Sequence, residues 1–147
     1  MTIEVLPPSL AEIVELFSTS PPRDRLELLL DYSQQVPSLP QRLLEHPERL
    51  EPVPECQSPL FVTAEVDDDR FVHLFVDVPR EAPTTRGFAG IMLAGLDGLS
   101  ADEVLAVPGD VTAWLGLAEV VSPLRMRGAT ALLSRIQRQV REQLAAA

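Results

Sequence analysis

The chain has 147 residues, of which 22 are acidic, 12 are basic and only one, Cys56, is cysteine. This length fits one domain, and an apolar content of 46% with 23% charged residues excludes a wholly disordered chain. One cysteine excludes an internal disulfide and a four-cysteine zinc site, and no apolar run is long enough for a transmembrane helix. We therefore predict a single domain over residues 1–147. It is expected to be cytoplasmic, because the N-terminus lacks the basic region of a signal peptide.

The formal net charge of −10 disfavours a nucleic-acid partner, since phosphate contacts need clustered basic side chains. The charge is uneven: residues 1–70 hold 14 acidic side chains and 5 arginines, whereas residues 122–147 hold 1 acidic side chain and 5 arginines. This basic stripe is either a solvated helix face or a surface that orients a protein partner. The chain contains neither lysine nor asparagine, a bias typical of a GC-rich bacterial genome.

Two helices are predicted before residue 37. The first begins at a capping box, Ser9 to Glu12, and the second begins after Ser20 in the run Ser-Pro-Pro. The residues expected on their buried faces are Leu10, Ile13, Leu16 and Phe17 in the first helix and Leu26, Leu29 and Leu30 in the second. Residues 37–59 then carry six prolines and predict a long irregular connection, a kind of segment that is usually functional or disordered.

Residues 60–66 and 71–78 are rich in β-branched and aromatic side chains and alternate apolar with polar positions. With the polar turn 67–70 between them, they predict an antiparallel hairpin. The rest of the chain is predicted to be helical. Thr84 or Thr85 would cap one helix, and Ser100 would cap another through a second capping box with Glu103.

A long final helix is predicted after the pair Ser122-Pro123. Its outer side would carry Arg135, Arg138 and Arg141. The predicted fold class is therefore α+β, with a small antiparallel sheet built on the hairpin 60–78, to which a third short strand could add, packed against several helices.

The sequence specifies no conventional set of catalytic residues, because the two histidines are 27 positions apart and no glycine-rich phosphate loop is present. A lone cysteine is most often a small core residue. Cys56, however, lies in a proline-rich loop just before a strand, where the prolines would hold the thiol in a defined pose. A reactive thiolate needs a nearby positive group. The negative charge of Glu55 disfavours the thiolate, so an arginine from elsewhere in the chain would have to offset this charge.

Three short motifs make the chain resemble a known family over nearly its whole length. They are Cys56-Gln57-Ser58 before the first predicted strand, Arg86-Gly87 after the hairpin, and Ser122-Pro123-Leu124-Arg125 followed by Gly128. In these positions the chain resembles the SufE family, sulfur acceptors that partner cysteine desulfurases in iron–sulfur cluster assembly.

The resemblance implies a SufE/NifU-like fold and an accessory sulfur-transfer role rather than a stand-alone enzyme. Cys56 would take persulfide sulfur from a cysteine desulfurase, stimulate that enzyme and pass the sulfur to an iron–sulfur scaffold. Pyridoxal phosphate belongs to the desulfurase, so no cofactor or metal is expected on this chain, and neither nucleic acid nor a membrane is an expected partner. Arg125 would contact the loop, stabilise the thiolate or be purely structural, and Gln57 would shape the loop through its amide.

Two alternatives stay open at this point. Glu55 stands where the family usually has glycine, which favours a non-catalytic module that still binds the desulfurase but has lost sulfur transfer. An iron–sulfur scaffold is the weakest alternative, because one cysteine and two distant histidines supply too few ligands.

Overall fold

The computed structural model describes residues 5–146, in which helices pack against one small sheet. The helices are α1 (Pro8–Thr19), α2 (Pro22–Ser33), α3 (Gln41–Leu44), α4 (Pro83–Leu96), α5 (Ala101–Ala106) and α6 (Pro123–Ala146). The strands are β1 (Glu51–Pro52), β2 (Phe61–Val66) and β3 (Val72–Asp77). Three short 3₁₀ turns complete the described elements: η2 (Pro47–Arg49), η3 (Val111–Leu115) and η4 (Leu117–Glu119). The predicted α+β class, the hairpin and the third short strand are all confirmed.

The sheet is antiparallel in the order β1-β2-β3, and Val62 pairs with Val76 at the centre of the hairpin. Its even-numbered side chains form the buried face, as the alternation predicted: Leu60, Val62, Ala64, Val72, Leu74, Val76 and Val78 are each less than 5% exposed. The turn between β2 and β3 contains Arg70, which has a φ of 70°. Among the described residues, it is the non-glycine residue with a left-handed backbone conformation.

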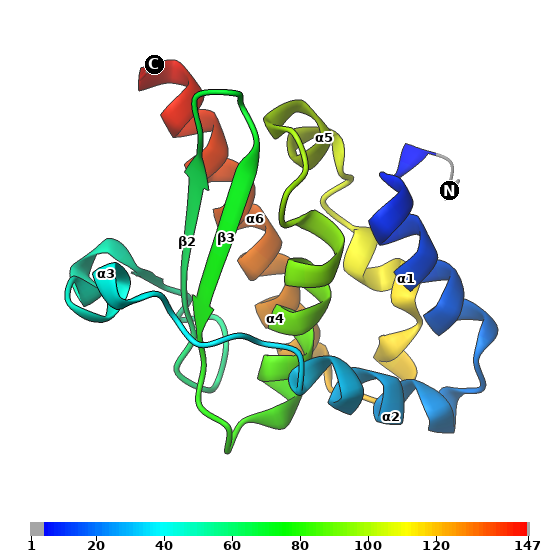
Figure 1. The fold of residues 1–147 in the computed structure, drawn as a ribbon. Helices are drawn as coiled ribbons and strands as arrows, with labels where there is room; N and C mark the ends of the chain where they lie inside the picture. Colours follow the sequence, from blue (N-terminus) through cyan, green and yellow to red (C-terminus); the bar gives the residue numbers. More distant parts are fainter. Residues whose placement is uncertain (1–4, 147) are drawn as a thin grey trace.

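Helix α6 crosses behind the hairpin, α4 packs beside β3, and α1 and α2 cover the far side of α4 (Figure 1). The contact between α2 and α4 is unusually close because α4 carries glycine at two positions. A Cβ added at Gly87 would lie 2.5 Å from the Leu29 carbonyl oxygen, and one at Gly90 would lie 2.1 Å from that of Tyr32. The glycine of the Arg-Gly motif is therefore needed for helix packing.

Arg86, the other half of that motif, joins three segments. Its guanidinium donates to the carbonyl oxygens of Val78 at 2.7 Å, Ser33 at 3.1 Å and Val36 at 3.2 Å. Ser33 is the last residue of α2, Val36 lies in the segment after it, and Val78 directly follows β3. The arginine thus satisfies partly buried carbonyls and is structural in this fold.

Strand β1 pairs with β2 only at Phe61 and Val62, and side chains of α6 cover the rest of that edge of β2. The Ala64 amide donates to Gln139 Oε1 at 2.7 Å, the Val66 amide donates to Gln143 Oε1 at 2.8 Å, and Gln143 Nε2 donates back to the Ala64 carbonyl. Two glutamines one turn apart therefore take the place of a neighbouring strand and fix α6 along the sheet edge.

Helices α1 and α4 begin at a proline, and not at the predicted serine or threonine cap. Helix α1 begins at Pro8 without a side-chain cap, and Ser9 instead donates its hydroxyl to the Gly95 carbonyl at 2.8 Å, so the first predicted capping box is wrong. Helix α4 begins at Pro83, which places Thr84 and Thr85 inside it rather than at its cap. A proline ring already holds the φ that a first helical turn needs. The Ser100 capping box is confirmed.

The predicted buried faces of the first two helices are too wide. Leu16, Leu26 and Leu30 are 43%, 39% and 37% exposed, whereas Leu29 is fully buried. For Leu26 and Leu30 the reason is that α2 meets α4 along a narrow stripe around Leu29, so leucines beside the stripe stay in solvent. Among the described residues, no helix is both long enough and apolar enough to cross a membrane.

Candidate functional site

The loop between β1 and β2 carries Cys56 and is closed by two backbone hydrogen bonds. The Val53 amide donates to the Leu60 carbonyl at 2.9 Å, and the Cys56 amide donates to the Val53 carbonyl at 3.1 Å. These bonds and the prolines between these residues restrict the backbone of the loop on which the half-buried thiol lies.

The Cys56 loop rests directly on α6, at Gly128. A Cβ added at Gly128 would lie 2.9 Å from Cys56 Sγ and 3.3 Å from its Cα, too close for an unshifted neighbour. The glycine that follows the Ser-Pro-x-Arg motif therefore leaves the space in which the cysteine sits.

A small cavity of about 10 Å³ lies beside the thiol, with room for about one water-sized group. It is lined by Cys56, Leu60, Thr85, Phe88, Arg125, Gly128, Ala129 and Leu132. Most of this lining is apolar, and Thr85 and Arg125 supply its polar side chains. On the solvent side, an open hollow of about 230 Å³ also includes Cys56 among its lining residues. Cys56 thus lies between this small cavity and the surface hollow.

The arginine that compensates for Glu55 comes from α6, and it is Arg135. Its Nη2 lies 3.0 Å from Glu55 Oε1, and its Nε lies 3.0 Å from Glu51 Oε2. Arg138 also pairs with Glu51. The prediction that Arg135 lies on the outer side of the final helix is therefore wrong, because the acidic β1 strand and its loop fold over that side, whereas the Arg138 side chain stays 42% exposed.

Glu55 itself is accommodated without backbone strain. Its φ is not positive, so the chain does not need a glycine before the cysteine. Spacing along α6 could have indicated Arg135, since Gly128, Leu132 and Arg135 at positions i, i+4 and i+7 share one helix face.

Arg125 and Gln57 are placed very differently. Arg125 lines the cavity beside Cys56, and no carboxylate of the described residues lies within 4.0 Å of its guanidinium. Gln57 is exposed, and its amide forms no hydrogen bond with the described part of the chain. The structure thus brings Cys56 and Arg125 together, and the loop-shaping role of Gln57 stays a prediction.

Burial raises the pKa of the Cys56 thiol from 9.0 to about 11. The negative charge of Glu55 contributes to this rise in the pKa, and the positive charge of Arg135 opposes it. In this closed conformation, the thiol is therefore protonated at neutral pH and weakly nucleophilic.

The rate of Cys56 alkylation by iodoacetamide should consequently keep rising up to about pH 11 in the folded protein. At pH 8 we expect about 100-fold less thiolate than an unperturbed cysteine would have, because the pKa difference is two units. The measurement is alkylation followed by mass spectrometry across this pH range, with the protein unfolded in guanidinium chloride as the control. A folded-state profile that levels off near pH 9 would contradict it.

The raised pKa of Cys56 also makes the stability of the fold depend on pH. The folded chain holds the thiol proton more tightly than the unfolded chain, so this group's contribution to stability is constant below pH 9. It declines as the pH rises from 9 towards 11.

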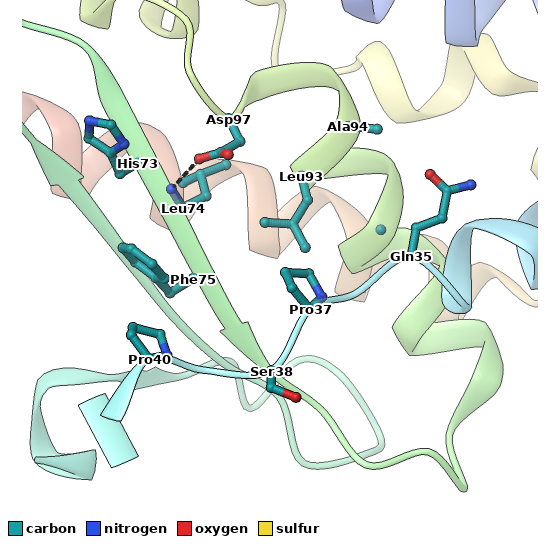
Figure 2. Close-up of a pocket in the computed structure, with 11 residues that line it drawn as sticks. Gln35, Pro37, Ser38, Pro40, His73, Leu74, Phe75, Leu93, Ala94 and Asp97 are labelled. Carbon is teal, nitrogen blue, oxygen red and sulfur yellow. Dashed lines mark hydrogen bonds between the residues drawn. The ribbon is translucent and has the colours of Figure 1, made fainter. Parts of the chain in front are cut away.

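A larger groove of about 550 Å³ lies elsewhere, between β3, α4 and residues 35–40 (Figure 2). Pro37, Ser38 and Pro40 come from the segment after α2, and the Asp97 carboxylate accepts the amide of Leu74 on β3 at 2.8 Å. The groove shares no lining residue with the cavity beside Cys56, so the two are separate.

Taken together, the fold and the site define a small α+β protein with one half-buried thiol on a loop that closes against its last helix. The family model SufE, described as an Fe-S metabolism associated domain, matches residues 11–140, and the chain belongs to this family. The resemblance read from the three motifs is thereby confirmed.

Its relatives agree with this assignment. An uncharacterised SufE-like protein of Mycobacterium tuberculosis is 50% identical over 93% of this chain and 94% of its own length. SufE-like protein 1, chloroplastic/mitochondrial, of Arabidopsis thaliana is 30% identical over 93% of this chain and 36% of its own length. The solution structure of a hypothetical protein from Thermus thermophilus superposes with a TM-score of 0.83 at 43% identity, covering 95% of this chain and 98% of that one.

Proposed function

We propose that this protein accepts sulfur from a cysteine desulfurase as a persulfide on Cys56, stimulates that enzyme and passes the sulfur to an iron–sulfur scaffold. The observation that carries the proposal is the position of the thiol, half-buried on a closed loop beside a cavity large enough for about one small atom. Membership of the SufE family supports the choice of partner.

The exchange needs no oxidant or reductant. The Cys56 thiolate attacks the terminal sulfur of the desulfurase persulfide and forms a new S–S bond. The S–S bond of the desulfurase breaks, and its electron pair leaves on the desulfurase cysteine. The proton released from Cys56 goes to that departing thiolate or to water. Pyridoxal phosphate stays on the desulfurase, and the reducing cytoplasm, where thiols persist, is the compartment that suits this exchange.

The cavity supports the second half of the relay, in which the sulfur is carried. A terminal sulfur on Cys56 that enters the cavity is surrounded mainly by apolar side chains, which keep water and other thiols away. Arg125 at the cavity wall provides a positive charge for an anionic persulfide. Because the chain has no second cysteine, the persulfide cannot collapse into an internal disulfide.

The proposal is tested by incubating the protein with a cysteine desulfurase and free cysteine, then recording its intact mass without reductant. We expect one added sulfur atom on the wild type and none on Cys56→Ser, which keeps the size of the side chain but lacks the thiol. A wild-type protein that stays unmodified while the desulfurase turns over would overturn the proposal.

The second candidate is a module that binds the desulfurase without accepting sulfur. The raised pKa of Cys56 and the Glu55 carboxylate beside it favour this candidate. It would be supported if Cys56→Ser binds the desulfurase and changes its turnover as strongly as the wild type does. Loss of stimulation in Cys56→Ser with binding retained would exclude it.

A further inference from the structure

We propose that Arg135 is a positioning residue for Cys56. Through its ion pairs with Glu55 and Glu51, it holds the Cys56 loop closed on α6 and neutralises the carboxylate beside the thiol. The role in sulfur transfer rests on the function proposed above, whereas the effect on the thiol itself does not.

The geometry of the pairs makes Arg135 a link between the two ends of the acidic segment. Glu51 lies on β1, before the loop, and Glu55 is next to Cys56 at its tip, and both carboxylates lie 3.0 Å from Arg135 nitrogens. The Arg135 side chain is only 20% exposed, so it is held between the loop and α6. We call the set of Glu51, Arg135 and Glu55 the Arg135 clamp.

Glu51 has additional partners and does not depend on Arg135 alone. Arg138 pairs with it, and Gln139 Nε2 donates to Glu51 Oε1 at 3.0 Å. Glu55, in contrast, has Arg135 as its partner among the described residues. Breaking the clamp therefore frees the Glu55 end of the loop while β1 stays in place.

The contact between Glu55 and Arg135 is suited to opening. The Glu55 side chain is 45% exposed, and ion pairs with such a solvent-exposed partner contribute little to stability. A docking partner that offers a cation to Glu55, or an anion to Arg135, can replace the contact at low cost. The clamp then decides whether the thiol is sheltered, without deciding whether the protein folds.

The charged groups that face Cys56 are few. Glu55 lies on the same loop, and α6 contributes Arg135 and Arg125. Helix α4 contributes Thr85 and Phe88, neither of which titrates in the relevant range. When either Glu55 or Arg135 is replaced by a neutral residue, the charge of the other one remains beside the thiol. The direction in which this charge shifts the pKa of Cys56 is therefore known.

The test compares iodoacetamide alkylation of Cys56 across pH in Arg135→Gln, Glu55→Gln and the double variant. The plateau rate at high pH reports access to the thiol, and the midpoint reports its pKa. All three variants lose the ion pair between Glu55 and Arg135, so all three should have a plateau above that of the wild type. Their midpoints should differ in a fixed order: highest in Arg135→Gln, which leaves Glu55 uncompensated, intermediate in the double variant, and lowest in Glu55→Gln.

At pH 8 we expect Arg135→Gln to react about threefold to tenfold more slowly than Glu55→Gln, as a difference of one-half to one pKa unit requires. Arg138→Gln is the matched control, because it removes a neighbouring arginine that does not contact Glu55, and its profile should match the wild type. A shared midpoint in the three variants, or a plateau no higher than that of the wild type, would overturn the proposal.

A salt series provides a second measurement that does not depend on the folding of Arg135→Gln. Raising the ionic strength to about 1 M shortens the screening length to about 3 Å and weakens the clamp. The alkylation plateau of the wild type should then rise, while that of Glu55→Gln stays constant. Because no desulfurase is present in either experiment, a failure here is distinct from a failure of sulfur transfer.

Discussion

Replacing Gly128 with alanine should release Cys56 from α6 while the protein keeps its overall stability. The added Cβ would lie 2.9 Å from Cys56 Sγ and 3.3 Å from Cys56 Cα, so the loop must move away. Within a helix, alanine is favoured over glycine by about 1 kcal/mol, which offsets the local contacts that are lost. The free energy of unfolding is therefore expected to stay within about 1 kcal/mol of the wild type.

The effect on the thiol should be much larger. Once the loop leaves α6, the pKa of Cys56 falls from about 11 towards 9.0, which corresponds to alkylation at pH 8 up to about 100-fold faster. Gly109→Ala is the control, because no atom lies within 4 Å of a Cβ added there, and it should leave the alkylation rate unchanged. Unchanged alkylation in Gly128→Ala would show that the loop is not held by this contact.

Replacing Gly90 with alanine should instead destabilise the whole protein. The new Cβ would lie 2.1 Å from the Tyr32 carbonyl oxygen and 2.8 Å from its carbonyl carbon, and a backbone cannot move aside as a side chain can. Helices α2 and α4 would have to separate. We expect a net loss of about 2 kcal/mol or more in the free energy of unfolding, even after the gain in helix propensity.

Gly95→Ala is the matched control for this prediction. It lies in the same helix and brings the same gain in propensity, but its Cβ would meet the end of the Leu10 side chain, at 2.8 Å from Cδ1. This side chain can change rotamer, so the loss of stability should be clearly smaller. Denaturant unfolding of both variants measures the difference, and equal losses would show that backbone proximity is not the cause.

Gly90 and Gly128 contribute to different properties of the molecule. Gly90 lies in the packed contact between α2 and α4, which supports the fold, whereas Gly128 lies under a loop held by a few local contacts. A sulfur carrier of the kind proposed requires both a firmly packed fold and a loop held by local contacts. Its thiol must be sheltered between transfers and released onto a partner without unfolding the rest of the chain.

The amino-acid sequence by itself determined the features that depend on local pattern. Alternating apolar residues specified the hairpin and its buried face, and the run after Pro123 specified the long last helix. The motifs around Cys56, Arg86 and Gly128 were sufficient to indicate the family. The proline-rich composition of the loop indicated correctly that Cys56 lies outside the regular elements.

The tertiary structure alone decided the features that depend on contacts between distant segments. Leu26 and Leu30 stay exposed because α2 packs through a narrow stripe, and Ser9 finds a carbonyl on α4 instead of capping its own helix. Arg135 is paired with Glu55, 80 positions earlier, because β1 and its loop cross that face of α6. Sequence periodicity describes one helix at a time and carries no information about what crosses it. The single thiol was therefore visible in the sequence, while the charges that surround it appeared only in the fold.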